Sequence, residues 1–107
     1  MISWPPMFPR LPLWRSPKWL EGARDESCVR CGTRNGTVVS AHYSGLYAEE
    51  FGKGRGIKVG DQMVADLCSR CHDHLDSYAG GNDDARALEF FRCILRTQMR
   101  RLAGGGW

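Results

Sequence analysis

The chain has 107 residues, of which 42% are hydrophobic and 25% are charged, and its formal net charge is +3. This length suits a single domain with a modest core, and the composition excludes a collagen-like or wholly disordered chain. A positive charge this small does not identify a nucleic-acid partner by itself. No run approaches the roughly 18 uncharged apolar residues of a membrane-spanning helix, so we expect no association with a membrane.

Residues 1–15 are rich in proline and tryptophan and follow neither a helical nor an alternating pattern. We expect an extended arm here, followed by one domain over 16–103 and a short tail over 104–107. The prolines also interrupt the apolar run that a signal peptide would require. We therefore expect a cytoplasmic protein, whose thiols stay reduced.

Ser16 and Pro17 form a helix-start signal, because a serine side chain caps a helix and proline suits its first position. They predict a short helix over 17–26 that packs Trp19 and Leu20 inward. A helix this short depends on such packing, since few residues contribute to its own hydrogen bonds.

Two short strands are predicted between the two Cys-x-x-Cys pairs of the chain. A β-rich run over 37–42 follows the turn signal Asn35-Gly36 and ends at His42. A second strand is expected around 63–65. The segment between them, 44–60, is rich in glycine and is expected to be a basic loop.

Two helices complete the predicted domain, over 69–78 and 84–103. Gly80-Gly81 ends the first of them, and Asn82 or Asp83 caps the second. Apolar residues recur at helical spacing along the last helix, and we interpret this stripe as core or as a dimer contact. Its members are Leu88, Phe91, Ile94, Leu95, Met99 and Leu102.

Four of the five cysteines form two Cys-x-x-Cys pairs, Cys28 with Cys31 and Cys68 with Cys71. In a reducing compartment, two such pairs indicate a tetrahedral structural zinc site rather than disulfides. Reduced spectator thiols and a redox pair are the alternatives. We interpret Cys93 as a spare thiol that is not a ligand.

The chain between and after the cysteine pairs carries a definite order of residues. That order is Cys28-x-x-Cys31, Ala41-His42, Asp61 and Leu67-Cys68-x-x-Cys71-His72-x-x-x-Asp76. Together with the segments 15–20 and 54–58, it resembles the HNH (ββα-metal, treble-clef) endonucleases over residues 15–78. The resemblance is closest to the small nuclease-like proteins that lambdoid phages and prophages encode, the YbcO type.

The resemblance implies an α+β fold, in which a small zinc-stabilised ββα-metal domain (HNH, treble-clef-like) has flanking N-terminal and C-terminal helices. It also implies a phage- or prophage-encoded, metal-dependent endonuclease that hydrolyses phosphodiester bonds of DNA in the cytoplasm of a bacterial host cell. Its cofactors would be a structural Zn²⁺ and a catalytic Mg²⁺ or Mn²⁺, with another divalent metal as an alternative. A homodimer is left open.

The candidate site residues have chemistry that suits this reaction, which needs an activated water and a cation. His42 is the expected general base, because an imidazole gains and loses a proton near neutral pH. His72 and Asp76 lie four residues apart on one helix face, so they can bind one divalent metal together. His74 faces elsewhere, and Asp61 is the candidate for a third metal ligand.

Two departures from the family pattern affect these assignments. Ala41 occupies the position where many HNH enzymes carry an acidic or histidine metal ligand. The third ligand is then missing, or it is supplied by Asp61, by water or by the substrate phosphate. The asparagine that the N in HNH stands for has no evident match in this chain, and Asp61 is its nearest counterpart. His42 is an alternative metal ligand instead of the general base. Structural alternatives are a core histidine at His42, a surface ion pair at Asp76 and a turn cap at Asp61.

Two basic sets are predicted to contact the phosphates of nucleic acid, and a solvated surface is the alternative for each. They are Lys53, Arg55 and Lys58 in the glycine-rich loop, and Arg92, Arg96 and Arg100 on the last helix. A second function is also open, a non-catalytic zinc-knuckle module that binds nucleic acid or protein. That module would need the four cysteines but neither His42 nor His72.

Overall fold

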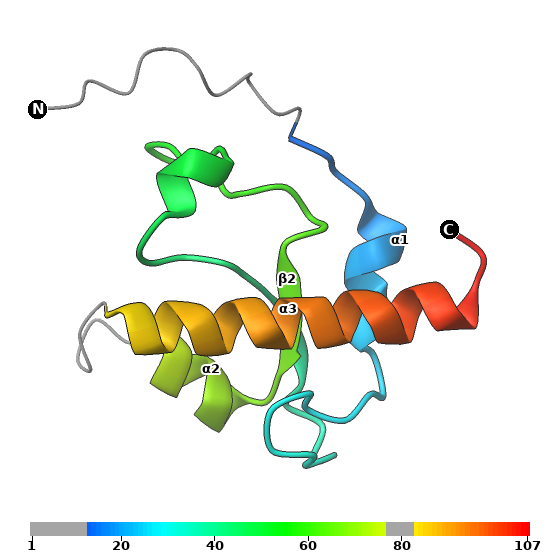
Figure 1. Cartoon of the computed structure of the whole chain (residues 1–107). Coiled ribbons are helices and arrows are strands. Elements are labelled where there is room, and N and C mark those ends of the chain that lie inside the picture. The colour runs from blue at the N-terminus through cyan, green and yellow to red at the C-terminus, as the bar shows by residue number, and fades with distance from the viewer. Residues whose placement is uncertain (1–12, 77–82) are drawn as a thin grey trace, which may run out of the picture.

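A two-stranded antiparallel sheet and a long C-terminal helix that crosses it form the centre of the computed structural model (Figure 1). The structure describes residues 13–76 and 83–107. Its elements in chain order are α1 (Pro17–Leu20), the 3₁₀ helix η1 (Glu21–Ala23), β1 (Val39–His42), the 3₁₀ helix η2 (Ala48–Phe51), β2 (Val64–Leu67), α2 (Ser69–Leu75) and α3 (Asp84–Gly104). The protein is therefore a small α+β domain, as the sequence predicted.

The first helix begins as predicted but is shorter than the predicted range 17–26. The Ser16 hydroxyl oxygen accepts a hydrogen bond from the Trp19 N–H at 3.1 Å, and Pro17 is the first helical residue. The helix tightens into η1 because the chain passes close to α3 at Gly22, where a Cβ would lie 2.3 Å from Nε of Arg101. Trp19 is buried as expected, whereas Leu20 is only partly buried.

The two strands pair with His42 opposite Val64 and Val39 opposite Leu67. β1 ends at His42 as predicted but begins two residues later than the predicted start at 37, and β2 extends two residues beyond the predicted 63–65. All four residues of β2 are buried, since α3 packs directly against this strand. Because β1 pairs with this buried strand, the end of β1 that carries His42 has a fixed position in the domain.

The last helix buries a different face from the predicted one. It spans Asp84–Gly104, and the side chain of Asp83 caps it by accepting a hydrogen bond from the Arg86 N–H. Of the predicted apolar stripe, only Ile94 is buried and Phe91 partly buried. The core interpretation is wrong for the other four members, which are exposed: Leu88, Leu95, Met99 and Leu102. The buried face instead consists of Ala87, Phe90, Cys93, Ile94, Thr97 and Arg101.

A buried ion cluster explains this orientation of α3. The carboxylate of Asp66 on β2 accepts hydrogen bonds from Arg100, at 2.7 Å, and from Arg101, while its backbone N–H donates to Oγ1 of Thr97 at 3.0 Å. The Arg101 guanidinium also donates to Ser40 on β1 and lies over the ring of Trp19, 5.3 Å from its centroid. Burial lowers the pKa of Arg101, and the Asp66 carboxylate opposes that change. A buried carboxylate such as that of Asp66 needs charged or hydrogen-bonding partners. The face of α3 that carries Thr97, Arg100 and Arg101 supplies these partners, and this face therefore lies toward β2.

The two ends of the described chain meet at a cluster of tryptophans. The Trp19 ring lies edge-on to Trp14 and Trp107, with centroid separations of 5.6 and 4.8 Å. The Trp107 indole N–H donates to the Arg101 carbonyl at 2.6 Å, so the predicted tail 104–107 packs on the domain. Trp14 also packs on the domain, so any extended arm ends before this residue. The rest of the predicted arm, 1–12, lies outside the described residues.

Within 13–76 and 83–107, no helix is both long and apolar enough to cross a membrane.

Replacing the buried acid should cost much of the folding free energy. We expect Asp66→Ala to lower the free energy of unfolding of the zinc-loaded protein by about 3–5 kcal/mol, because Arg101 would remain buried without its counter-charge. Urea unfolding followed by circular dichroism measures this change. Glu50→Ala, at an exposed acid of η2, is the control and should change the free energy by less than about 0.5 kcal/mol. An equally small change for Asp66→Ala would contradict a structural role for the cluster.

Candidate functional site

The two cysteine pairs converge into one group of thiols. The Sγ atoms of Cys28, Cys31, Cys68 and Cys71 all lie within 4.8 Å of one another. Cys28 and Cys31 stand in a tight turn that Gly32 closes with a φ of 80°, its N–H donating to the Cys28 carbonyl. Cys68 caps α2 and Cys71 lies in the first turn of that helix. The group therefore joins the segment after η1 to the junction of β2 with α2.

This group fits a tetrahedral zinc ion. Zinc–thiolate bonds of about 2.3 Å imply sulfur–sulfur separations of about 3.8 Å, and Cys31 and Cys68 lie 3.7 Å apart. Burial alone would raise the pKa of Cys28, but hydrogen bonds from the backbone of Cys68, Cys31 and Arg30 lower that pKa to about 7. Burial and its thiol neighbours raise the pKa of Cys71 to about 12. With zinc bound, all four sulfurs would be thiolates, because the cation would offset the negative charge that keeps Cys71 protonated without it.

Cys93 lies outside the thiol group, as predicted. Its side chain is fully buried on α3, and burial raises the pKa of its thiol to about 11. A neutral buried thiol of this kind behaves as a small apolar side chain. Cys93 is therefore part of the core.

A second feature lies next to the thiol group, a cavity of about 370 Å³. It is lined by the end of β1, by the glycine-rich loop and by α2. The lining residues are Ser40, Ala41, His42, Tyr43, Ser44, Lys53, Lys58, His72 and Asp76. Five of the predicted site residues are thus brought together at one cavity: His42, Lys53, Lys58, His72 and Asp76.

Asp61 contacts His42 and does not line this cavity. Its Oδ1 lies 2.8 Å from Nε2 of His42 and 3.3 Å from Nη1 of Arg15, and its Oδ2 accepts a hydrogen bond from the Ser16 N–H at 2.7 Å. Burial alone would raise the pKa of Asp61, but the hydrogen bonds from His42, Ser16 and Arg15 outweigh burial and lower it. The carboxylate is therefore ionised and fully engaged. The structure places Asp61 as the partner of His42 and away from the proposed ligands on α2.

Arg15 was assigned to the arm by sequence reasoning, yet it belongs to this site. Besides Asp61, its guanidinium donates to the carbonyl oxygens of Val59, at 2.5 Å, and Lys58, at 2.8 Å. It therefore fixes both the acid behind His42 and the end of the basic loop. The sequence signals for this role are its position directly before the Ser16 cap and its place in the segment 15–20 that carries part of the family resemblance.

His72 and Asp76 lie side by side on α2, with Nε2 and Oδ2 separated by 3.5 Å. The hydroxyl of Ser44 donates to the other carboxylate oxygen, a contact that the sequence did not reveal. His74 lines a different cavity, as its predicted orientation requires. Among the described residues, only the four cysteines form a group of three or more potential ligands.

The pair His72 and Asp76 nevertheless fits a hard divalent cation. Octahedral Mg²⁺ with bonds of about 2.1 Å needs neighbouring ligand atoms about 3.0 Å apart, so the observed 3.5 Å separation requires only a small closure. Mg²⁺ commonly keeps several waters and is bound through one or two carboxylates together with substrate phosphates. Here Asp76 offers the carboxylate, and the imidazole of His72 is a ligand more typical of transition metals.

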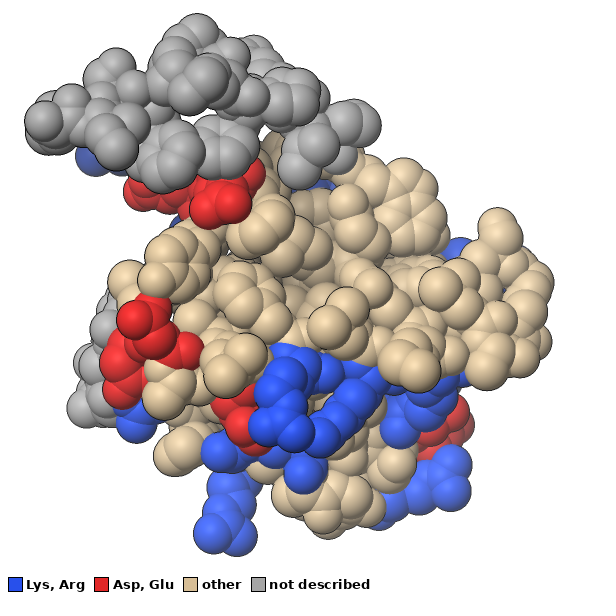
Figure 2. Space-filling view, in the orientation of Figure 1, with Lys and Arg blue, Asp and Glu red and all other residues tan. Residues whose placement is uncertain are grey.

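The predicted basic residues fall into different environments. Lys53 and Lys58 line the cavity, and Arg55 is exposed at the tip of a tight turn that two hydrogen bonds of 3.0 Å close between Gly54 and Ile57. Figure 2 shows Lys and Arg side chains gathered along one side of α3.

The three predicted arginines of α3 are not equivalent. Arg92 is exposed, with Glu89 3.9 Å away, and Arg96 is exposed near the Val29 carbonyl. Arg100 is bound to Asp66, to the Ser27 carbonyl and to Glu26. Arg100 is thus engaged with the buried acid, whereas Arg92 and Arg96 present their charge to the surface, and the predicted phosphate contacts of the three stay a prediction.

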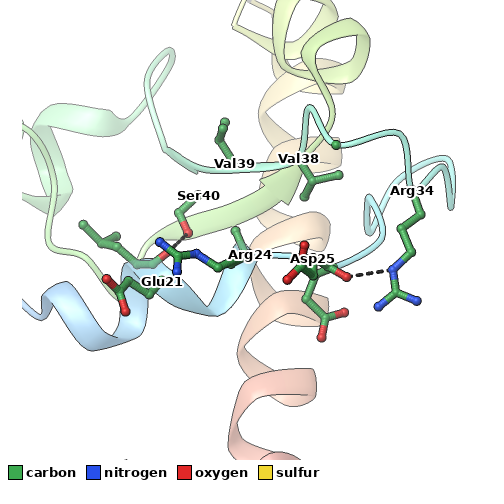
Figure 3. A pocket seen from close by; sticks show the side chains of 11 residues that line it. Glu21, Arg24, Asp25, Arg34, Val38, Val39 and Ser40 are labelled. Carbon is green, nitrogen blue, oxygen red and sulfur yellow. Dashed lines mark hydrogen bonds between the residues drawn. The ribbon is translucent and has the colours of Figure 1, made fainter.

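The largest cavity described, about 540 Å³, is not at the predicted site. It lies between η1, the following segment and the start of β1, and Figure 3 shows acidic and basic side chains around it. Arg34 donates to the Asp25 carbonyl at 2.7 Å, and Ser40 donates to the Leu20 carbonyl at 2.7 Å. These two hydrogen bonds go to backbone carbonyls, and none of the predicted site residues lines this cavity, so we assign it no chemistry.

Comparisons with known protein families, curated proteins and solved structures gave no match. The function is therefore argued from the geometry of the thiol group and the neighbouring cavity.

Zinc binding should depend on pH and on the four clustered cysteines. Protons compete with zinc for the thiolates, so lowering the pH below about 7, the pKa of Cys28, should weaken zinc binding by at least about tenfold per pH unit. Competition with a chromophoric chelator at several pH values measures this. Removing zinc with excess chelator should unfold the domain, as seen by circular dichroism.

Matched cysteine variants test the assignment of the ligands. Cys31→Ser should lose tight zinc binding, whereas Cys93→Ala should retain one zinc per chain, because Cys93 lies outside the group. Native mass spectrometry gives the stoichiometry. Retention of zinc by Cys31→Ser at unchanged affinity would exclude a four-thiolate site.

Proposed function

We propose that the protein is a metal-dependent DNA endonuclease of the HNH (ββα-metal) type. The observation that carries this proposal is the single cavity shared by His42 from β1 and by His72 and Asp76 from α2. The family resemblance assigns these residues as base and as metal ligands, and their convergence supports that assignment. The resemblance also favours a phage or prophage origin, with a role in processing, recombination or packaging of DNA.

His42 is the general base of the proposed reaction. Its Nε2 is hydrogen-bonded to the ionised Asp61, at 2.8 Å, which assigns the ring proton to Nε2. Nδ1 then keeps a lone pair that can accept the proton of an attacking water. As the water oxygen bonds to phosphorus, its proton passes to Nδ1, the bond from phosphorus to the leaving oxygen breaks, and the leaving oxygen takes a proton from solvent water. Asp61 stabilises the imidazolium that forms, and Arg15 holds Asp61 in position.

His72 and Asp76 are the proposed ligands of a catalytic Mg²⁺ or Mn²⁺. Bound there, the cation would supply positive charge to the phosphoryl oxygens as negative charge develops on them. The Ser44 hydroxyl orients the Asp76 carboxylate through the oxygen that faces away from His72. This arrangement supports a two-ligand site and makes a third ligand at position 41 or 61 unnecessary.

Lys53, Arg55 and Lys58 are the proposed phosphate contacts. Two of them line the cavity that contains His42, and Arg55 extends from the turn between them. The turn is held in shape by its own hydrogen bonds and by Arg15, so these cations are presented with little loss of conformational entropy. Arg92 and Arg96 remain candidates for more distant phosphates.

Removing the base should abolish cleavage without disturbing the fold. We expect His42→Ala to lower the rate of Mg²⁺- or Mn²⁺-dependent plasmid nicking by about 10²–10⁴-fold. Zinc content and thermal stability should match those of the unaltered protein. His74→Ala is the control, since His74 lines a different cavity, and it should cleave normally.

The alternative function, a non-catalytic zinc-knuckle module, predicts binding of DNA without cleavage. If zinc-loaded, unaltered protein binds DNA but cleaves none of a panel of duplex, branched and single-stranded substrates with several divalent metals, the protein is a non-catalytic zinc-knuckle module. A second, weaker divalent site that His72→Ala removes would fit only the nuclease.

Asp61→Asn should impair chemistry more than binding. An amide no longer fixes the ring proton on Nε2 of His42, so we expect kcat to fall by at least about 10²-fold while KM for DNA changes little. Steady-state cleavage kinetics separate the two constants. Asp73→Asn, at an exposed position on α2, is the matched control. A rise in KM at constant kcat would show that Asp61 acts only on the fold of the loop.

A further inference from the structure

The solvent face of α3 carries an apolar surface that the proposed nuclease does not use. Leu88, Leu95, Met99 and Leu102 are 61%, 58%, 72% and 60% exposed. Leu88 and Leu102 lie about 21 Å apart along the helix at about 1.5 Å per residue. Figure 2 shows the surface of α3 with the basic side chains along one side of it. Four large apolar side chains exposed along one helix, interrupted only by Arg92, are an unusual feature of a small domain and point to an interaction site.

The spacing of this surface is that of a coiled-coil seam. Leu88, Leu95 and Leu102 recur every seven residues, and Ala85, Arg92 and Met99 recur with the same period. The two series alternate by three and four residues, which is the pattern of the a and d positions of a heptad. We call these six residues the α3 ridge. A seam with this period is complementary to another helix of the same kind.

The residues of the α3 ridge favour a second copy in antiparallel orientation. In a parallel pair each a residue faces itself, which would place Arg92 against the same arginine of the partner and leave a gap at Ala85. In an antiparallel pair a faces d, so Ala85 would meet Leu102 of the partner subunit. Leu88 would meet Met99 of the partner subunit, and the aliphatic stem of Arg92 would lie on Leu95 of the partner subunit.

Flanking charges agree with the antiparallel arrangement. Glu89 and Arg96 occupy the e positions beside the ridge, and in this register Glu89 lies beside Arg96 of the partner subunit, twice by symmetry. Glu89 is partly exposed and already contacts Arg30 at 3.1 Å, while Arg96 is exposed. Opposite charges therefore flank both halves of the seam.

We propose that the α3 ridge is a homodimer interface, in which two copies pack their last helices antiparallel about a two-fold axis between residues 93 and 94. α3 is already folded against β2, so association does not have to order the helix. The seam is only two heptads long, so we expect a weak, reversible dimer. This interface does not involve the cavity of His42, His72 and Asp76, but it would occupy Arg92 and Arg96, so in the dimer these two residues would not contact distant phosphates.

Sedimentation analysis of the full chain tests the interface. The zinc-loaded protein should show a monomer–dimer equilibrium, and Leu95→Asp should weaken it at least tenfold while zinc content and thermal stability stay unchanged. Ile57→Asp introduces the same charge at an exposed apolar residue away from α3 and should leave the equilibrium unaltered. Dimerisation that survives Leu95→Asp overturns the proposal, and so does equal weakening by both variants.

Mixed-chain cross-linking tests the orientation. A mixture of Leu88→Cys and Met99→Cys chains, zinc-loaded and mildly oxidised, should give a disulfide-linked heterodimer, whereas either variant alone should give little. Efficient linkage of Leu102→Cys to itself would indicate a parallel pair and overturn the antiparallel assignment, because the two copies of this residue lie at opposite ends of an antiparallel seam. A protein that stays monomeric at hundreds of micromolar but sediments with anionic lipid vesicles through the same ridge would overturn the dimer.

Discussion

Four thiols gathered within a few ångströms are the constraint on which the rest of this small domain depends. They come from two stretches almost forty residues apart, and one of those stretches leads directly from β2 into α2. The same junction sets where α2 begins, and so where His72 faces relative to the end of β1. A metal ion that neutralises the thiolates would therefore also fix the geometry of the neighbouring cavity. The same metal-bound group of cysteines would therefore determine both the folding of the domain and the geometry of the proposed catalytic site.

The ion cluster at Asp66 has a comparable influence on the orientation of α3. Its carboxylate is buried on β2 and is satisfied by consecutive arginines of α3. Because these arginines must face inward, the leucines that follow a seven-residue period on the same helix face outward. The exposure of the α3 ridge is thus the result of a requirement for charge pairing elsewhere on the helix.

Sequence reasoning succeeded where the signal is local. The Ser16 cap, the end of β1 at His42 and the shared face of His72 and Asp76 each depend on residues within one turn or strand. It failed for contacts between distant segments, such as Arg15 with Asp61, because no spacing rule relates residues 46 positions apart. The burial of Arg101 was missed for a different reason: periodicity marks an apolar face of a helix but does not say whether that face is covered by the protein's own core.

The tryptophan cluster has a practical consequence for following this protein in solution. Three of its four indoles, Trp14, Trp19 and Trp107, lie where the beginning and the end of the described chain meet. Their emission would therefore report on the region where the two ends meet, and only indirectly on the thiolate centre. Fluorescence and zinc release would consequently follow two separate regions of the molecule, and a difference between their transitions would reveal fraying of the termini before the metal knuckle opens.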